Sequence, residues 1–223
     1  MASRTNTLKR SVVVLGLGRF GKSLALELMS QGTEVMGIDS DAELVQSMAG
    51  RLTHVVQADT TNEEALRQLS VQDFGQAVVG IGTDLEASIL TTSVLVDLGI
   101  GNIWAKAVSA SHAKILGKIG AHHVVRPEHD MGKRVAHLVS GTLLDYIEFD
   151  DGYAMVKTTP PSIIWGRALG ETGARAKYGI TVVGVKRIGQ QFTYASPETV
   201  LERGDLVIVA GKRKDVEAFA ALG

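Results

Sequence analysis

The stretch Ser11–Gly21, which reads SVVVLGLGRFG, decides the fold of this chain. Its aliphatic first half predicts a strand over Ser11–Leu15, and the spacing G-x-G-x-x-G follows at once over Gly16–Gly21. A helical pattern of apolar residues then covers Arg19–Gln31. A glycine turn between a strand and a helix is the context that the dinucleotide-binding fingerprint requires. This stretch therefore predicts a nucleotide-binding βαβ unit, and the alternative is a glycine turn that has lost its ligand.

Strand and helix patterns continue to alternate through the first 140 residues. Strands are predicted at Ser11–Leu15, Glu34–Asp39, His54–Ala58, Gln76–Ile81, Asn102–Lys106 and His122–Arg126. Helices are predicted at Arg19–Gln31, Ala42–Ala49, Asn62–Leu69, Leu85–Leu98 and Ser111–Ile119. Because such alternation with short turns produces parallel βαβ units, we predict an α/β fold. Residues 1–140 are expected to form a Rossmann-like, doubly wound parallel sheet that binds a nucleotide.

The pattern changes after Asp130. One more helix is predicted over Gly132–Ile147, and the acidic segment Glu148–Gly152 suggests a hinge. The remaining patterns are strands at Tyr153–Thr158, Thr181–Arg187, Gln190–Thr193 and Asp205–Ala210, and helical pieces at Gly166–Lys177 and Lys212–Leu222. Residues 141–223 are therefore predicted to form a small α+β domain. A unit of this size has a thin core and often relies on a partner copy.

The composition excludes several classes of protein. Among 223 residues, 23 are basic and 24 acidic, so the net charge of −1 argues against nucleic acid as a partner. The chain has no cysteine, which excludes thiolate metal sites and a thiol nucleophile. No apolar run reaches the roughly 18 residues of a spanning helix. The apolar stretch Val12–Leu17 is interrupted by Gly16, so a secretory signal is not expected. We expect a cytoplasmic protein.

The glycine motif assigns separate tasks to its members. Gly16 suits the tight turn, Gly18 lets the backbone approach phosphates, and Gly21 lets helix and strand pack closely. Asp39 ends the second predicted strand, where a carboxylate accepts hydrogen bonds from ribose hydroxyls and repels a 2′-phosphate. Alternatively, an acidic residue there caps the next helix, a task that Asp41 could also perform.

Three further residues favour a phosphate-rich ligand. Asp59 ends the third predicted strand and could face adenine, or it could cap the helix that follows. Arg19 in the glycine motif suits a terminal phosphate better than an internal pyrophosphate. Lys106, at the carboxyl end of an apolar strand, points toward the ligand crevice or is a surface lysine. Together Arg19 and Lys106 favour a nucleoside diphosphate or triphosphate.

The sequence offers little catalytic machinery. It has no P-loop, no G-x-S-x-G and no His-x-x-x-His, so we do not expect an enzyme. A cation bound to the nucleotide would need oxygen ligands, for which Glu128 is the best candidate. Alternatively, these acidic and histidine residues, Glu128, His129 and Asp130, form a polar loop between a strand and a helix.

A series of motifs in a fixed order resembles one family. GLGRFG, GIDSD, QADTTN, GIGTDLEAS, IWAKA and VRPEHDMG resemble the cytosolic regulatory subunits of Ktr/Trk potassium uptake systems, which belong to the RCK (regulator of conductance of potassium) group. RAKYGITVVGVKR and SPETVLERGDLVIVAG are similar to the C-terminal subdomain of that family, also called TrkA_C or RCK_C. The resemblance thus covers nearly the whole chain and implies an RCK_N domain followed by an RCK_C domain.

The resemblance implies a gating function. In that family, dimers assemble into an octameric ring beneath a membrane dimer of the KtrB or TrkH type that translocates potassium, and ATP or ADP changes the ring. Arg19 would reach the γ-phosphate of ATP, and Glu128 would hold Mg2+ or Ca2+ beside the nucleotide. The remaining predicted contacts lie in the same motifs: Gly16, Gly18, Phe20, Gly21, Asp39, Ser40, Asp59, Ile81, Gly82 and Lys106. The protein would be peripheral at the inner face of the cell membrane.

The resemblance also implies a second ligand. Some relatives bind cyclic di-AMP in the C-terminal subdomain, and Arg175, Ala176 and Pro197 fall in the matching segments. The sequence around Ile163 and Ile164 matches only loosely.

Two other functions use the same fingerprint. A small NAD-dependent oxidoreductase and an NAD(H)-binding redox sensor would both need the glycine motif and Asp39. The motifs would bind the adenosine part that ATP and NAD have in common, so they do not distinguish between these two ligands.

Overall fold

The computed structural model describes residues 11–139 and 143–223. The chain forms two compact units, Met1–Glu128 and His129–Gly223, which we call the N-terminal and C-terminal units. The boundary predicted after residue 140 lies outside the described residues and stays a prediction.

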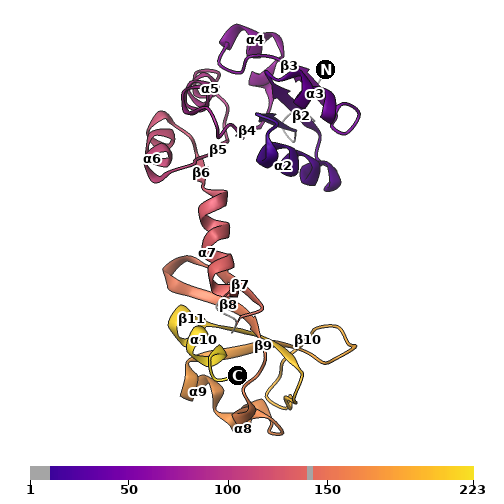
Figure 1. The fold of residues 1–223 in the computed structure, drawn as a ribbon, viewed down its shortest axis with the longest axis vertical. Helices are drawn as coiled ribbons and strands as arrows, with labels where there is room; N and C mark the ends of the chain where they lie inside the picture. Colours follow the sequence, from indigo (N-terminus) through magenta and orange to yellow (C-terminus); the bar gives the residue numbers. More distant parts are fainter. Residues whose placement is uncertain (1–10, 140–142) are drawn as a thin grey trace. The chain divides into compact units, whose positions relative to one another are not determined.

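The N-terminal unit is built on a six-stranded parallel sheet with the order β3-β2-β1-β4-β5-β6 (Figure 1). Its strands are β1 (Val12–Leu15), β2 (Val35–Asp39), β3 (His54–Gln57), β4 (Gln76–Val79), β5 (Ile103–Lys106) and β6 (His123–Val125). Its helices are α2 (Arg19–Ser30), α3 (Ala42–Met48), α4 (Glu63–Gln68), α5 (Leu85–Asp97) and α6 (Ala110–Ile119), with the short 3-10 helix η1 (Val71–Asp73). The doubly wound sheet predicted from the sequence is thereby confirmed.

Both faces of this sheet are buried, which explains why β1 is apolar along its whole length. On one face, Val13 and Leu15 belong to a cluster with apolar residues of α4, α5 and α6. On the other face, Val12 and Val14 pack with residues of α2 and α3. The helices therefore cover the sheet on two sides.

The strand order reverses at β1. The chain passes outward from β1 to β2 and β3 and then crosses back to β4, on the other side of β1. In an open parallel sheet, this reversal leaves a crevice at the carboxyl ends of the strands, where ligands bind.

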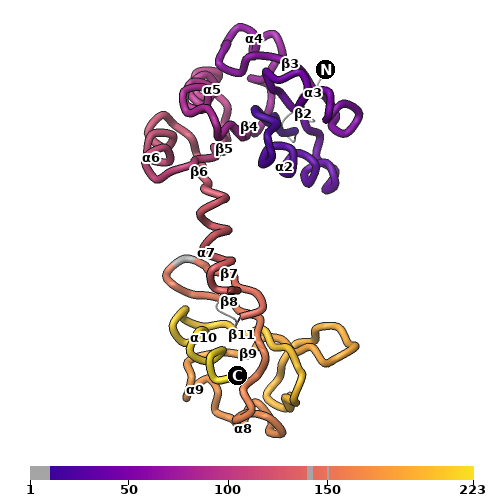
Figure 2. The backbone as a smooth tube through the Cα atoms, viewed as in Figure 1, coloured from indigo at the N-terminus to yellow at the C-terminus, as the bar shows by residue number. Residues whose placement is uncertain are grey.

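The C-terminal unit contains a five-stranded antiparallel sheet with the order β10-β9-β11-β8-β7. Its strands are β7 (Asp145–Glu148), β8 (Tyr153–Thr158), β9 (Ile180–Lys186), β10 (Thr193–Tyr194) and β11 (Leu206–Lys212). Its helices are α8 (Leu169–Thr172), α9 (Ala174–Tyr178), α10 (Arg213–Ala220), η2 (Asp150–Gly152) and η3 (Ser162–Ile164), and α7 (Pro127–Val139) precedes them. Figure 2 follows the backbone from β8 through α8 and α9 into β9.

The helix predicted over Gly132–Ile147 is wrong in its extent. The described part of α7 starts earlier, at Pro127, and the segment Asp145–Glu148 forms β7. Tyr146 lies opposite Val156 of β8 and is only 3% exposed. Cross-strand pairing with a later segment therefore overrides the helical spacing of the apolar residues. In the acidic segment that suggested a hinge, Glu148 ends β7 and η2 (Asp150–Gly152) leads into β8.

Candidate functional site

A cavity of about 540 Å3 lies at the carboxyl ends of the parallel strands. Its size is typical of sites for small molecules. The predicted residues that line it are Gly16, Gly18, Arg19, Phe20, Asp39, Ser40, Asp59, Ile81, Gly82, Lys106 and Glu128. They come from the segments that follow all six strands, so the topology brings together residues from distant parts of the N-terminal unit.

The glycine loop after β1 uses its three glycines differently. Gly16 has φ +95°, a conformation that side chains disfavour. A Cβ at Gly21 would lie 1.9 Å from the carbonyl oxygen of Gly16, so the helix can approach the loop only with glycine there. At Gly18, no atom of the residues that the structure describes lies within 4 Å of the position that a Cβ would take. The backbone at Gly18, the N-cap of α2, is therefore open to the cavity, whereas Gly21 packs against the loop at Gly16.

Asp39 connects β2 to the glycine loop. One carboxylate oxygen accepts a hydrogen bond from the Leu17 N–H at 2.5 Å, and the other accepts from the Asp41 N–H at 2.9 Å. Asp41 itself caps α3 by accepting from the Glu43 N–H at 2.8 Å. The capping task that the sequence left open thus belongs to Asp41, and Asp39 stays at the edge of the cavity.

Asp59 is exposed and lines the same cavity. Its carboxylate accepts from both the backbone N–H and the hydroxyl of Thr61. These hydrogen bonds, the side-chain one first, hold the pKa of Asp59 below its ordinary value. Asn62, not Asp59, caps α4 by accepting from the Ala65 N–H at 3.2 Å. Asp59 is therefore a fixed anion at the cavity rim.

Lys106 and Glu128 both line the cavity and form an ion pair of 2.6 Å. The Lys106 side chain is only 11% exposed, and its ammonium lies 5.6 Å from the centre of the Phe20 ring. The hydrogen bond from Lys106 is the largest of the effects that lower the pKa of Glu128, and the Arg19 guanidinium lowers it further. The Glu128 carboxylate thus interacts electrostatically with both Lys106 and Arg19.

The sequence analysis missed several residues of the cavity. These are Asp41, Leu44, Thr60, Gly80, Thr83, Asp84, Ala87 and Val108. Most of them lie near the carboxyl end of a predicted strand or at the start of the next helix. Their positions in the sequence could therefore have identified them as cavity residues. Some also have local tasks, since Asp84 caps α5 by accepting from the Ala87 N–H at 2.9 Å.

Acidic and histidine side chains do not cluster in the part of the chain that the structure describes, where no three of them could hold a metal ion. Glu128 offers one carboxylate, 67% exposed, beside the cavity. A divalent cation prefers six or more oxygen ligands, so a cation at Glu128 would need oxygens from a bound phosphate and water. The residues present fit a cation carried by a nucleotide rather than one held by protein alone.

A second cavity of about 420 Å3 lies in the C-terminal unit. Arg175, Ala176 and Pro197 all line it, together with residues of α8 and β9. The Arg175 Nε donates to the hydroxyl of Thr181 in β9 at 3.2 Å, which links this side chain to the strand. Of the loosely matching pair, Ile164 is buried in the core and Ile163 is 64% exposed.

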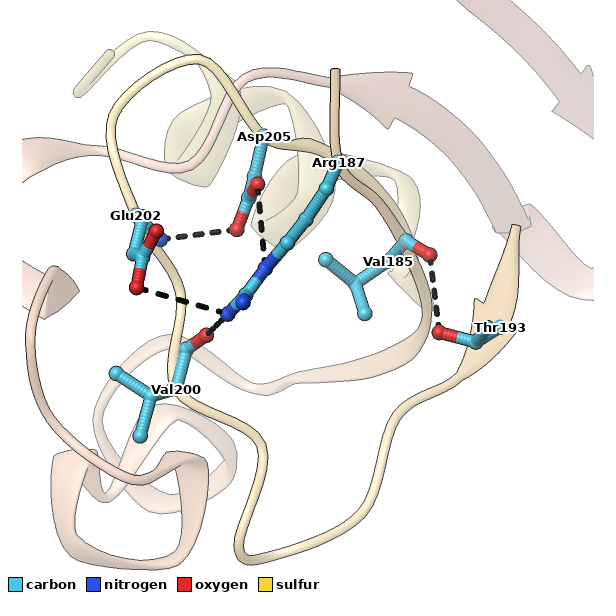
Figure 3. Close-up of polar contacts among 6 residues, drawn as sticks. All are labelled: Val185, Arg187, Thr193, Val200, Glu202 and Asp205. Carbon is cyan, nitrogen blue, oxygen red and sulfur yellow. Dashed lines mark hydrogen bonds and ion pairs between the residues drawn. The ribbon is translucent and has the colours of Figure 1, made fainter. Parts of the chain in front are cut away.

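Arg187 contacts Val200, Glu202 and Asp205, which follow Pro197 in the chain (Figure 3). The Arg187 guanidinium donates to the Val200 carbonyl at 3.0 Å and lies 3.7 Å from Glu202 and 3.9 Å from Asp205. The buried Asp205 carboxylate accepts from the Glu202 N–H at 2.9 Å. This cluster fixes the chain between β10 and β11.

No helix in the described ranges, 11–139 and 143–223, is long and apolar enough to cross a membrane.

Two domain families match this chain. Residues 12–127 match the TrkA-N domain and residues 153–222 match the TrkA-C domain. The chain is 39% identical over 213 residues to Ktr system potassium uptake protein C of Bacillus subtilis, covering 95% of this chain and 96% of that protein. It is 36% identical over 211 residues to Ktr system potassium uptake protein A of the same organism, covering 94% and 95%.

A solved structure shares the fold. The GsuK channel bound to NAD superposes with a TM-score of 0.65 at 18% identity, over 96% of this chain and 39% of that one. At this identity the likeness concerns the fold alone.

Proposed function

The chain belongs to the family of proteins with a TrkA-N and a TrkA-C domain, and from this premise we propose that it is a regulatory subunit of a potassium uptake system. The support is the identity of 39% with a Ktr system potassium uptake protein along almost the entire length of both chains. On this proposal the protein is cytoplasmic, is not an enzyme, and acts on an integral membrane subunit of the KtrB or TrkH type that translocates potassium.

We propose that the regulatory signal is whether ATP or ADP occupies the cavity at the carboxyl ends of the parallel strands. Its glycine loop suits phosphates, Asp39 suits a ribose, and Lys106 supplies a cation. Arg19 is exposed at the start of α2, where its forked guanidinium can reach a terminal phosphate. The γ-phosphate is the group that ADP lacks, so Arg19 and a Mg2+ or Ca2+ ion at Glu128 would discriminate between the two nucleotides.

The difference between ATP and ADP binding would control potassium flux by shifting the populations of two conformations of the protein. A nucleotide can favour one conformation only by as much as it binds that conformation better. Coupling free energies of about 1–3 kcal/mol are typical of such linkage. We propose that dimers assemble into an octameric ring at the inner face of the membrane, and that ATP favours the conducting form of this ring.

The cavity of the C-terminal unit is the proposed site for cyclic di-AMP. It gathers Arg175, Ala176 and Pro197, and a guanidinium suits a phosphodiester. Binding there would inhibit potassium flux.

NAD(H) is a second candidate for the first cavity. The observation in its favour is the fold shared with a channel solved with NAD bound. The Asp39 carboxylate suits the adenosine ribose of NAD as well as that of ATP.

Calorimetric titration with ATP, ADP, NADH and cyclic di-AMP, with and without Mg2+, tests these proposals. We expect ATP to bind more tightly than ADP, and Arg19→Ala to abolish this difference while the fold is retained. Arg51→Ala is the matched control, because Arg51 precedes β3 and lies outside the cavity lining. Preference for NADH with equal affinity for ATP and ADP would favour the redox-sensor alternative.

Potassium flux through the membrane subunit tests the regulatory step. With the wild-type protein, flux should be higher in ATP than in ADP. With Arg19→Ala, flux should be the same in both nucleotides. A wild-type protein that leaves flux independent of the nucleotide would contradict the proposed function.

A further inference from the structure

The two members of the Lys106–Glu128 ion pair differ in their freedom to move. Lys106 is enclosed, because its side chain is 11% exposed and a Cβ at Gly82 would lie 3.3 Å from both its Cε and its Nζ. The centre of the Phe20 ring lies 5.6 Å from its ammonium. Glu128 is 67% exposed and stands at the edge of the cavity. If a third group competes for the ammonium, the carboxylate is the member that can leave.

Nucleotide phosphates would be such a competitor. The glycine loop and Lys106 line the same cavity, so phosphates at Gly18 and Arg19 would come within reach of the Lys106 ammonium. An ammonium has three donors and binds phosphate as readily as carboxylate. A phosphate chain and the Glu128 carboxylate are both anions, so they repel each other when they share one ammonium.

We propose that nucleotide phosphate displaces Glu128 from Lys106, and that the released carboxylate becomes a ligand for the divalent cation that the phosphates carry. This inference rests on the proposed nucleotide site and adds the order of events within it. While Lys106 holds Glu128 at 2.6 Å, its positive charge opposes a cation at that carboxylate. Once phosphate neutralises Lys106, the same carboxylate favours the cation. Lys106 thereby makes cation binding depend on the nucleotide.

The exchange predicts that Glu128→Gln changes nucleotide affinity in opposite directions with and without a divalent cation. In EDTA, the variant leaves Lys106 free for phosphate, so ATP should bind about two- to fivefold more tightly than to the wild-type protein. In Mg2+, the variant lacks the released carboxylate ligand, so ATP should bind more weakly than to the wild type. Calorimetry on the full chain measures both arms.

A double-mutant cycle separates the exchange from simple repulsion between carboxylate and phosphate. In a Lys106→Met background, Glu128→Gln should tighten ATP binding in EDTA by less than about twofold, because no ammonium is released. Methionine retains an unbranched apolar side chain beside Phe20. Lys106→Gln is a second variant for this arm, and thermal unfolding confirms that each variant is folded. Glu86→Gln, at the start of α5, is the matched control for loss of one negative charge at the same edge of the sheet.

Two outcomes would overturn the exchange. Equal tightening by Glu128→Gln in the wild-type and Lys106→Met backgrounds would show simple repulsion. An effect of the same sign in EDTA and in Mg2+ would show that Glu128 does not change partners. If wild-type protein binds neither ATP nor ADP under any condition, the proposed nucleotide function fails and the exchange fails with it.

Discussion

Asp39 and Leu17 are joined by a hydrogen bond of 2.5 Å, in which the backbone N–H of the glycine loop donates to a carboxylate at the end of β2. The residue suited to a ribose thus also fixes the loop suited to phosphates. Because the two features share one side chain, we expect a change at Asp39 to affect both the proposed ribose position and the proposed phosphate position.

Replacing Asp39 should therefore lower both stability and nucleotide affinity. Asp39→Ala removes the acceptor of the Leu17 and Asp41 N–H groups, which should cost about 1–3 kcal/mol in the free energy of unfolding. Asp39→Asn retains a carbonyl acceptor and should cost less. Urea unfolding and ATP titration measure the two effects. A stability of Asp39→Ala equal to that of the wild type would contradict the bracing role of this carboxylate.

The two glycines Gly21 and Gly18 should respond differently to the same substitution. A methyl group at Gly21 would meet the Gly16 carbonyl at 1.9 Å, so Gly21→Ala should destabilise the N-terminal unit by more than about 2 kcal/mol. Gly18→Ala meets no atom of the described residues within 4 Å, but alanine is a poorer N-cap than glycine, so it should cost about 0.5–1 kcal/mol, less than Gly21→Ala. Its methyl group would point into the space proposed for phosphates, so it should weaken ATP binding. Thermal unfolding and calorimetry of both variants check this contrast, which equal stabilities would refute.

The Asp205 carboxylate should contribute to the stability of the C-terminal unit. Its side chain is 4% exposed, accepts from the Glu202 N–H and faces Arg187 (Figure 3). Asp205→Ala leaves that N–H without its acceptor and removes the partner of a cation, which should cost about 1–3 kcal/mol. Asp205→Asn keeps an oxygen acceptor and isolates the effect of the charge. Chemical denaturation monitored in the C-terminal unit provides the measurement, and an unchanged midpoint for Asp205→Ala would count against the cluster.

The pair Arg134–Asp145 should make stability depend on acid pH. Arg134 donates to Asp145 at 2.6 Å, and this hydrogen bond is the main reason why the pKa of Asp145 is lowered. Because the folded pKa lies below the unfolded value, the contribution is present above about pH 4 and is lost as pH falls through the folded pKa. Both side chains are 43% exposed, so solvent limits the effect to about 0.3–1 kcal/mol.

Asp145→Asn tests this dependence. The free energy of unfolding, measured between about pH 7 and pH 3, should fall less in the variant than in the wild type. Arg134→Gln should reduce the dependence in the same way. Identical pH profiles for all three proteins would show that the ion pair does not stabilise the fold.

The N-terminal unit was largely predictable from local sequence. Buried parallel strands are apolar on both faces, so runs such as Val12–Leu15 stand out, and each glycine or aspartate that follows marks where a strand ends. All six predicted strands correspond to observed ones with similar bounds. Asp39 and Lys106 each lie at the carboxyl end of a parallel strand, so both residues lie at the same edge of the sheet.

The error at β7 has the opposite cause. The segment Asp145–Glu148 has apolar neighbours at helical spacing, and Tyr146 and Ile147, which favour strands, form too short a run to predict one. Pairing with β8 buries Tyr146 and decides its conformation. A strand that depends on a partner cannot be predicted from its own periodicity.

The sequence by itself thus determined the repeating βα units, the glycine turn and the residue types at the strand ends, because these depend on local periodicity and backbone sterics. Only the tertiary structure decided which of those residues meet. Lys106 and Glu128, 22 residues apart, become partners because β5 and β6 lie side by side. Lys106 is enclosed beside Phe20 and Gly82, whereas Glu128 is exposed. Such differences in burial arise from packing between distant segments, which no local pattern encodes.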